Sequence, residues 1–597
     1  MAAAPGARRG RISDKTDKPK DTGYVLKGLW YYVSHYKVHL IIAIVLTIGG
    51  NLLALIGPRL SGLAIDAIEP GKGKVAFDTV FYYVKWMVLI YIASSILSYI
   101  LSILMIRLSQ KIIKKMREDV FNKLVELPVS YFDKHQVGDI ISKFSYDIDT
   151  INTSLSSDII QICAGTITVI GSFIMMVIIS PILVLVMLVT IPLALLYTRY
   201  MAKKVRPLFR RRSVKLGELN GFVEEMVSGQ MTIKAYAAEN AVMERFDSIN
   251  TDTAEAYYKA EYYGSMTGPT VNFINNLSLS LITVFGAVLY LSGNMSLGNI
   301  SSFIQYSRKF SGPINEMANI ISELQSAMAA AERVFKLMDE EPEPADIENA
   351  KELNDIKGDV NVEGVSFGYL QDRIILKKLF LHAAPGSLTA IVGPTGAGKT
   401  TIINLLMRFY DVWDGSIYVD GSEIRDVTRR SLRKAYAMVL QDTWLFSGTI
   451  FDNIAYGKEN ATMEEVVEAA KMAGIHSYIR RLPDGYNTVI NEDGMNISKG
   501  QKQLLTIARA MLLDAKMLIL DEATSNVDTR TEIKIQKAMR RLMEQKTCFV
   551  IAHRLSTIQG ADNILVIDQG DVVEQGTHQE LMNKKGFYYK LYHSQFD

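Results

Sequence analysis

The residues best suited to chemistry lie in a glycine-rich run in the second half of the 597-residue chain. Apolar residues 388–392 before the run favour a strand, and residues 401–406 after it favour a helix. In that setting glycines let backbone N–H groups wrap a phosphate, a lysine reaches the β- and γ-phosphates, and a hydroxyl binds Mg²⁺. The sequence therefore predicts a nucleoside triphosphate site formed by Gly393, Pro394, Thr395, Gly396, Ala397, Gly398, Lys399, Thr400 and Thr401.

Two further segments follow this phosphate-binding loop. Ser498, Lys499, Gly500 and Gln501 come about a hundred residues later, and the run 517–520 then leads into Asp521 and Glu522. A carboxylate at the end of an apolar strand is costly unless it is paired. Binding of Mg²⁺ explains Asp521, and Glu522 is placed to orient or deprotonate an attacking water.

The three segments together resemble the nucleotide-binding domain of ATP-binding-cassette (ABC) proteins, whose signature normally reads Leu-Ser-Gly-Gly-Gln. The resemblance covers roughly residues 24–597. It implies that Tyr369 stacks on adenine and that Gln441 touches Mg²⁺ and the attacking water. It also implies γ-phosphate contact by His553, communication between paired domains through Asp528, and coupling-helix contact by Glu492.

In this family ATP lies between the phosphate-binding loop of one domain and the signature of a second. Ser498, Lys499, Gly500 and Gln501 are therefore expected to act on the nucleotide of a partner half-transporter. Lys499 stands where the family has glycine. One interpretation is a tolerant position in a homodimer. The favoured interpretation is a heterodimer in which this chain supplies the intact glutamate and its altered signature completes an impaired site.

The first half of the chain reads as a membrane domain, since about 20 apolar residues span a bilayer. Six spans are expected near 38–66, 79–107, 156–179, 181–201, 270–292 and 297–320. An aromatic-rich segment before them, residues 24–36, fits an interfacial helix. Residues 1–23 are polar and basic, have no apolar signal-peptide core, and are expected to form a disordered cytosolic tail.

Basic residues predict the orientation of these spans. They crowd residues 107–123 after the second span and 199–215 after the fourth, whereas residues 67–78 carry two lysines and residues 292–297 none. The positive-inside rule then puts both termini in the cytosol, in a multi-pass protein of the bacterial plasma membrane.

The cytosolic connections 108–155 and 202–269 read as helices that continue out of the membrane. They turn near residues 128–132 and 232–236, where exporters of this family have coupling helices that press on the cassettes. The alternative is that Tyr131 and Tyr236 merely pack inside helical hairpins.

Polar residues within the spans are candidates for a substrate cavity: Asn51, Asn272, Asn275, Asn276, Arg308 and Lys309. Arg308 and Lys309 lie about 16 Å into the sixth span at 1.5 Å per residue. A charge at this depth is costly without a partner or water. For the asparagines, hydrogen bonding between helices is the favoured interpretation; for Arg308 it is a water-filled cavity.

The domain organisation expected is a transmembrane domain at 24–335, a linker at 336–358 and a nucleotide-binding domain at 359–597. The fold class is an all-α six-helix membrane domain followed by an α/β P-loop (RecA-like) domain with a helical subdomain. A net charge of +2 gives no reason to expect nucleic acid as a partner. Two distant cysteines form no disulfide framework.

The expected function is ATP-driven export by alternating access, with ATP and Mg²⁺ required and a second half-transporter as partner. The favoured substrates are those of a multidrug-type pump; a lipid flippase or peptide exporter working as a homodimer is the alternative. An ATP-gated channel or regulator has the same sequence features. A DNA- or ribosome-directed ATPase conflicts with six spans, an importer with the fused cassette, and a processing peptide exporter with the short N-terminal segment.

Overall fold

The computed structural model describes residues 21–68, 75–441, 443–490, 497–521, 528–552 and 555–596. The chain forms two compact units. The first comprises residues up to Glu126 together with Gln136–Glu340, and the second comprises Leu127–His135 together with Glu341–Asp597. The short segment Leu127–His135 thus belongs to the second unit, although the residues on both sides of it belong to the first.

The first unit is helical. Its elements are α1 (Thr22–Ser34), α2 (Lys37–Asp66), α3 (Phe77–Glu126), α5 (Val137–Ser142), η1 (Lys143–Asp147), α6 (Ile148–Thr153), η2 (Ser154–Asp158), α7 (Ile159–Ile179), α8 (Pro181–Ser228), α9 (Gln230–Ala235), α10 (Glu239–Ser265), α11 (Thr267–Leu291) and α12 (Leu297–Met338).

Five helical stretches of the described residues are long and apolar enough to cross a membrane: Lys37–Asp66, Phe77–Glu126, Val137–Ile179, Pro181–Ser228 and Glu239–Leu291. They contain the first five expected spans. The sixth, near 297–320, lies in α12, which is helical but does not join them. Asn299, Gln305, Arg308 and Lys309, with several serines, make its first turns too polar for composition alone to mark a span.

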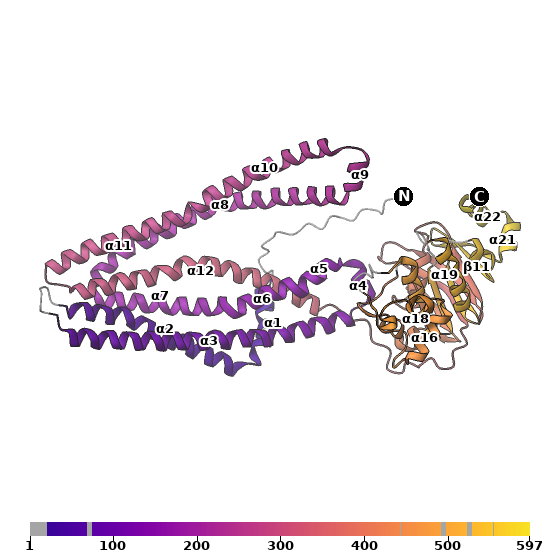
Figure 1. Ribbon diagram of the computed structural model, residues 1–597, viewed down its shortest axis with the longest axis horizontal. Coiled ribbons are helices and arrows are strands. Elements are labelled where there is room, and N and C mark those ends of the chain that lie inside the picture. Colours follow the sequence, from indigo (N-terminus) through magenta and orange to yellow (C-terminus); the bar gives the residue numbers. More distant parts are fainter. Residues whose placement is uncertain are drawn as a thin grey trace. The chain divides into compact units, whose positions relative to one another are not determined.

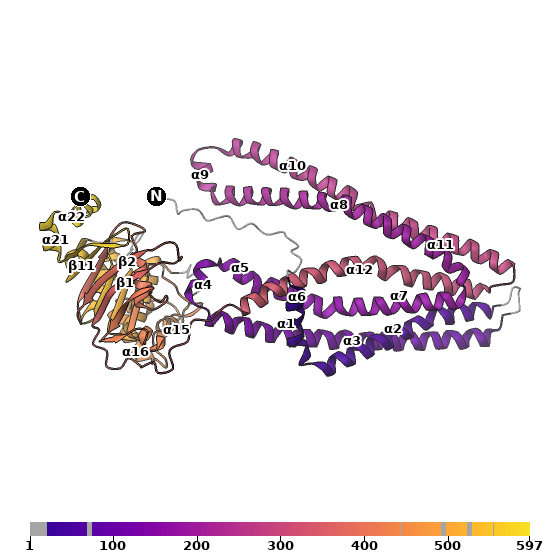
Figure 2. The ribbon, with the colours of Figure 1, turned by 180° about the vertical axis from the view of Figure 1, so that it is seen from behind.

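Figures 1 and 2 show α8 and α10 running side by side as a long hairpin with α9 at its tip. Near α9 the hairpin stands apart from the bundle of α2, α3, α7 and α12 in both views, whereas the first turns of α8 pack against α7 and α12. Local sequence explains where α8 begins: the Ser180 hydroxyl accepts a hydrogen bond from the Leu183 N–H, and Pro181 occupies the first turn.

The start of α12 is fixed against the end of α2. Asp66 accepts hydrogen bonds from the Gly298 N–H at 2.7 Å and from the Ser296 hydroxyl at 2.7 Å. A Cβ on Gly298 would lie 1.9 Å from the Gly62 carbonyl oxygen, so only glycine permits this approach of the two helices. Further along, Tyr306 donates to the Leu55 carbonyl and Ser302 to the Pro58 carbonyl.

A buried ion pair joins the helical run α5–α7 to α12. Asp147, in the π-helical turn η1, is 3% exposed, and the Arg333 guanidinium on α12 binds both its carboxylate oxygens at 2.9 and 2.6 Å. Two-point binding by arginine fixes orientation as well as distance. The pair therefore sets how the helix that leads to α7 lies against α12.

The second unit is α/β. A four-stranded antiparallel sheet has the order β2-β1-β4-β5, and a six-stranded sheet has the order β12-β11-β3-β10-β9-β6, in which β11, β3, β10, β9 and β6 are parallel. The strands are β1 (Val360–Phe367), β2 (Leu376–Ala383), β3 (Leu388–Val392), β4 (Asp414–Val419), β5 (Ser422–Glu423), β6 (Tyr436–Val439), β7 (Gly448–Thr449), β8 (Val489–Ile490), β9 (Met517–Asp521), β10 (Thr547–Ile551), β11 (Asn563–Asp568) and β12 (Asp571–Gly576).

Helices flank these sheets and build a separate helical part. They are α4 (Val129–Lys134), α13 (Lys399–Leu406), α14 (Arg429–Ala435), α15 (Ile450–Ala455), α16 (Met463–Met472), α17 (His476–Ile479), η3 (Gly485–Asn487), α18 (Lys499–Leu513), α19 (Thr529–Met543), α20 (Leu555–Gln559), α21 (His578–Lys584) and α22 (Phe587–Phe596). Strands β3, β9 and β10 are almost wholly buried, as strands covered on both faces must be. The predicted fold class is confirmed.

The Asp147–Arg333 pair predicts a stability difference. Arg333→Ala leaves a buried carboxylate without its partner, which costs about 1–3 kcal/mol after allowance for the partial exposure of the arginine. The full-length protein in detergent should then unfold at a lower temperature. Arg117→Ala is the control, because its 2.8 Å pair with Asp149 is exposed on both sides. Equal shifts for the two variants would contradict the role given to Asp147.

Candidate nucleotide site

The predicted triphosphate-binding residues gather at one edge of the parallel sheet. The phosphate-binding loop follows β3, Asp521 ends β9, and Gln441 comes two residues after β6. Strands β6 and β9 are neighbours with Val439 beside Leu520, and β10 lies between β9 and β3. Because parallel strands end at a common edge, segments distant in sequence meet there, and ligands bind at this edge in open α/β sheets.

Glycine is required in the phosphate-binding loop for two different reasons. Gly393 has φ +155°, and a Cβ there would lie 2.1 Å from the Ile567 carbonyl oxygen. Gly396 has φ +84° with nothing within 4 Å of its Cβ position. Glycine is favoured there by the left-handed backbone conformation, and the space beside it is open. Such a loop, opening into the N-terminus of α13, fits the phosphates of a nucleotide.

Lys399 is the cation of this loop. Its ammonium donates to the carbonyl oxygens of Gly393 at 2.7 Å and Pro394 at 3.0 Å. Burial lowers the pKa of Lys399, and the negative charge of Asp521 opposes that shift. A cation and a carboxylate at the same edge of the sheet suit the joint binding of phosphate and metal.

The oxygen donors at this edge suit Mg²⁺, which prefers hydroxyl, carboxylate and phosphate oxygens over nitrogen or sulfur ligands. Thr400 is exposed at the start of α13, Asp521 is partly buried, and Gln441 is exposed. Among the described residues, no group of three His, Cys, Asp or Glu side chains is arranged so that it could hold a metal ion by itself. These donors fit a metal that also takes ligands from a bound triphosphate.

Tyr369 lies beside the P-loop helix. Its hydroxyl donates to Thr401 at 3.3 Å and accepts from the Asn404 amide at 3.0 Å. Thr401 and Asn404 are three residues apart on α13 and so share one face. The ring packs edge-on against Phe367 and Tyr410 at 5.2 and 5.0 Å and remains 38% exposed, which leaves ring surface open to a base.

The signature residues begin α18. Ser498 is its N-cap and forms a capping box with Gln501: the Gln501 N–H reaches the Ser498 hydroxyl at 3.3 Å, and the Ser498 N–H reaches the Gln501 side chain at 3.0 Å. Lys499 is exposed and Gly500 is buried. Lys499 thus presents a cation at the electropositive end of a helix.

Some expected residues fall outside the described ones: Glu522, His553 and Glu492. Asp528 is described and caps α19 by accepting a hydrogen bond from the Thr531 N–H at 2.9 Å. That backbone hydrogen bond is the first cause of a lowered pKa for Asp528, which keeps its carboxylate charged.

Sequence reasoning missed Tyr410 and Asp133. Tyr410 packs against Tyr369 and donates a hydrogen bond to Asp133 of α4, the helix that belongs to this unit although its neighbours in sequence do not. Burial and this hydrogen bond raise the pKa of Tyr410, so its hydroxyl stays protonated. No motif marked either residue; only the turn predicted near 128–132 pointed to this region.

The two predicted turns differ in burial. Tyr131 on α4 is 5% exposed and stacks on His135 with ring centroids 4.1 Å apart, in a segment that belongs to the second unit and not to a hairpin of the first. Tyr236, directly after α9, is 81% exposed. The packing interpretation is therefore wrong for Tyr236.

The candidate cavity residues of the membrane half lie on three helices. Asn51 accepts a hydrogen bond from Thr168 of α7 at 3.3 Å and donates to its own helix, which agrees with bonding between helices. Lys309 donates to the Ala54 carbonyl at 3.3 Å, and Arg308 is exposed. Asn272 and Asn276 are exposed one turn apart on α11, and Asn275 is partly buried.

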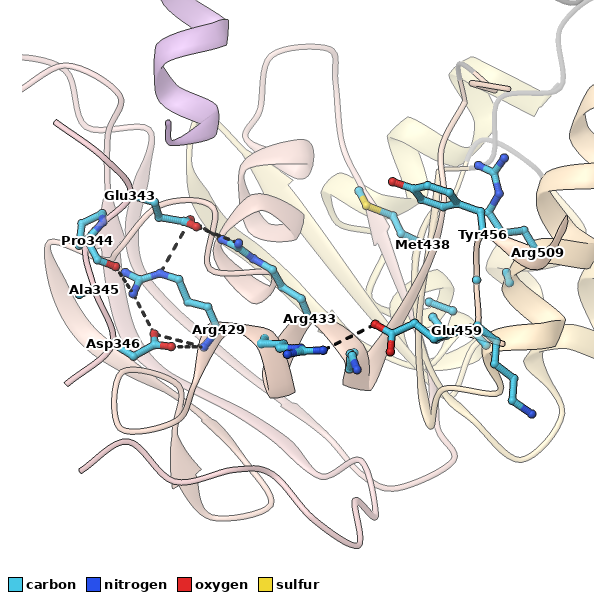
Figure 3. A pocket seen from close by; sticks show the side chains of 17 residues that line it. Glu343, Pro344, Ala345, Asp346, Arg429, Arg433, Met438, Tyr456, Glu459 and Arg509 are labelled. Carbon is cyan, nitrogen blue, oxygen red and sulfur yellow. Dashed lines mark hydrogen bonds and ion pairs between the residues drawn. The ribbon is translucent and has the colours of Figure 1, made fainter. Parts of the chain in front are cut away.

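A cavity of about 1100 Å³ in the second unit lies elsewhere. Figure 3 shows Glu343 and Asp346, from the segment before β1, bound to Arg429 and Arg433 of α14 on one side of it. Tyr456 and Arg509 lie on the other side. These ion pairs hold the segment after α12 against the cassette fold.

The chain is similar to curated proteins over nearly its whole length. It is 42% identical to the uncharacterized ABC transporter ATP-binding protein YfiC of Bacillus subtilis (strain 168), covering 98% of this chain and 96% of the relative. It is 44% identical to a fatty acid ABC transporter ATP-binding/permease protein of Mycobacterium tuberculosis (strain CDC 1551 / Oshkosh), over 88% and 83%. An ATP-dependent lipid A-core flippase of Syntrophus aciditrophicus (strain SB) is 33% identical over 91% of each.

A solved structure and two family models agree with these relatives. A bacterial Atm1-family ABC exporter with ATP bound matches with a TM-score of 0.74 and 31% identity, over 94% of this chain and 98% of that one. The ABC transporter transmembrane region matches residues 40–314 and the ABC transporter domain matches residues 376–525. The chain belongs to the ABC transporter family, as an exporter half-transporter in which one multi-pass membrane domain is joined to one nucleotide-binding ATPase domain.

Proposed function

We propose that two such halves hydrolyse ATP to move an amphiphilic, lipid-like substrate out of the cytosolic leaflet. The observation that carries this proposal is the contact of α4 with the nucleotide site. Segment 127–135 leaves the membrane-domain helices α3 and α5, yet its Asp133 binds Tyr410, which packs on Tyr369. A change at the nucleotide is thereby passed to a segment joined covalently to two helices of the membrane domain.

ATP is the substrate of the cassette, and each residue takes a stated part in its turnover. Gly393–Thr401 and Tyr369 bind the nucleotide, with Lys399 on its phosphates. Thr400, Asp521 and Gln441 hold Mg²⁺, which supplies charge neutralisation of the phosphates when bound. Glu522 acts on the attacking water, with His553 beside the γ-phosphate. The support is the meeting of β3, β6 and β9 at one sheet edge.

The halves work in pairs, as ABC exporters do. Ser498, Lys499, Gly500 and Gln501 face the nucleotide of the partner, and Asp528 lies at the junction between the cassettes. We favour a heterodimer, since Lys499 departs from the glycine of the signature and is exposed at the start of α18. Its positive charge and bulk alter the site completed for the partner, while this chain keeps the glutamate of its own site.

The substrate class is an amphiphile with an acyl chain, in preference to a general multidrug substrate. Two relatives that align over most of their length are named for fatty acids and for lipid A-core. The exposed Arg308 on α12, with Asn272 and Asn276 on α11, supplies polar lining for the path. The membrane is the bacterial inner membrane with both termini cytosolic, supported by the basic residues at 107–123 of α3 and 199–215 of α8, directly after the second and fourth expected spans.

Replacement of the glutamate tests the ATPase assignment. Glu522→Gln removes the group that acts on water, so ATP turnover should fall by about 10²–10⁴-fold, the usual contribution of a general base. Binding of ATP, measured with a fluorescent nucleotide, should persist. Turnover unchanged in the variant would refute the assignment; lost binding would show a different role for Glu522.

Removal of one hydroxyl group tests the contact between α4 and the aromatic pair Tyr369 and Tyr410. Tyr410→Phe keeps the ring that packs on Tyr369 but cannot donate to Asp133. We expect ATP binding to be kept and the stimulation of ATPase activity by lipid substrate to be reduced. Tyr418→Phe, on β4, is a matched control of the same chemistry. A fully retained stimulation in Tyr410→Phe would remove the observation on which coupling is argued.

Purification of the chain alone tests the pairing. A heterodimer subunit should show little ATPase activity by itself. It should gain activity when it is co-expressed with a half-transporter encoded by an adjacent gene whose sequence lacks the corresponding glutamate. Mass photometry reports which pair forms. A fully active homodimer of this chain would disprove the heterodimer and leave the ATPase assignment intact.

A further inference from the structure

The cytosolic continuation of α8 carries a basic stripe, defined here as Arg199, Lys203, Arg206 and Arg210. The spacings of four, three and four residues put all four on one face of a helix. All four are exposed, and none forms an ion pair or hydrogen bond within the part of the chain that the structure describes. Their neighbours differ: Arg212 pairs with Glu261, and Lys215 pairs with Glu218 and Asp252.

An apolar cavity lies on the same helix, closer to its start. It measures about 160 Å³ and is lined by Phe173 and Met176 of α7, Val184, Leu188 and Pro192 among others of α8, and Phe310 of α12. The rings of Phe173 and Phe310 lie 6.1 Å apart. Pockets for drug-sized ligands measure ~300–1000 Å³. This cavity is smaller and has room only for part of a chain of methylene groups.

Cavity and basic stripe share one face of α8. Residues 188, 192, 199, 203, 206 and 210 follow one another at steps of four, seven, four, three and four, and α8 continues as one helix through them. From Pro192 to Arg199 the rise is about 10 Å at 1.5 Å per residue. Tyr197 and the exposed Tyr200 flank Arg199, and tyrosines of this kind mark the level of the membrane–water interface.

We propose that this face of α8 is a binding site for an anionic, single-chain amphiphile of the cytosolic leaflet, with its head on the basic stripe and a part of its chain about 10 Å or more from the head in the cavity. The assignment rests on the proposed lipid export and names the place where substrate is taken up. Basic clusters directly cytosolic of a span attract anionic lipids by about 1 kcal/mol per cation. An apolar cavity on the same face adds selection for an acyl chain.

The positive-inside rule alone would also place cations here. The chain offers a matched control for that explanation. Arg107 and Lys111 of α3 are likewise exposed, four residues apart, directly after a predicted span, and without an ion pair in the described part of the chain. Helix α3 contributes no residue to the cavity. Removal of the charges on α3 therefore removes cations that the positive-inside rule explains, and it leaves the proposed site on α8 intact.

The test is photolabelling of the full-length protein, with its functional partner, in phosphatidylcholine nanodiscs. The probe is a fatty acid with a diazirine on its chain, and a monoacylglycerol with the same chain is the neutral probe. The fatty acid should label α7, α8 or α12 beside the cavity. Arg199→Gln with Lys203→Gln should weaken this labelling about 10- to 30-fold, since each cation is worth roughly fivefold. Arg107→Gln with Lys111→Gln should leave it unchanged.

Two further arms complete the design. Leu188→Trp fills the cavity and should reduce labelling at Phe310 without changing the charge of α8. The neutral probe should label wild type and the α8 double variant equally and more weakly than the fatty acid. Equal losses in both double variants, equal binding of the two probes, or labelling away from these helices would overturn the proposal.

A protein occupant of the basic stripe gives a different result. If the four cations meet a partner subunit, the α8 double variant should lower dimer formation in mass photometry while labelling stays at the wild-type level, which contradicts a lipid site. The labelling is also carried out in Glu522→Gln, where it should persist. A protein that shows no ATP turnover would refute the proposed function, whereas lost selectivity of labelling refutes only the α8 site.

Discussion

The negative charge of a bound triphosphate is the constraint around which the cassette is built. A triphosphate bound at the edge of the parallel sheet would need its charge balanced there. Among the described residues, the groups placed to do so are the backbone N–H groups of the glycine loop, the first turn of α13 and the ammonium of Lys399, which donates to the Gly393 carbonyl. Glycine at Gly393 is forced by the closeness of Ile567, so the loop path is dictated by the neighbouring strand.

The proposed control of the membrane helices by the nucleotide depends on the same part of the cassette. The groups that would touch the nucleotide are themselves held by a small polar and aromatic network. Asn404 and Thr401 fix the hydroxyl of Tyr369, Tyr369 packs on Tyr410, and Tyr410 binds Asp133 of α4. A helix of six residues thus belongs to the same compact unit as the candidate nucleotide site and is covalently joined to α3 and α5.

Much of this was predictable from sequence, for identifiable reasons. The phosphate-binding loop, the strand ending at Asp521 and the serine that caps α18 are each determined by residues close together in the sequence, so a local pattern predicts them. The span in α12 was harder, because Arg308, Lys309 and Gln305 dilute its apolarity while partners on α2 satisfy part of its polarity. The Tyr410–Asp133 bond joins residues 277 apart and has no local signature. The exposure of Tyr236 could not be predicted either, because the sequence indicated only a turn there.

The position of Lys499 at the start of α18 bears on its proposed role. It is exposed at the first position of α18, where the helix dipole disfavours a cation, so its charge does not stabilise the helix. The basic stripe on α8 has the same character: cations that the fold does not use internally. In the proposals made above, Lys499 acts on a partner's nucleotide and the basic stripe acts at the membrane.

The central claim is that ATP hydrolysis by this chain moves an acyl-chain amphiphile between leaflets. Its most direct test is a proteoliposome assay in which a fluorescent anionic lipid in the outer leaflet, on the side of the cassettes, is followed by its protection from an impermeant quencher. ATP should increase the protected fraction, and Glu522→Gln should abolish the increase. ATP turnover with no change in protection, or with an ion current in its place, would contradict the account.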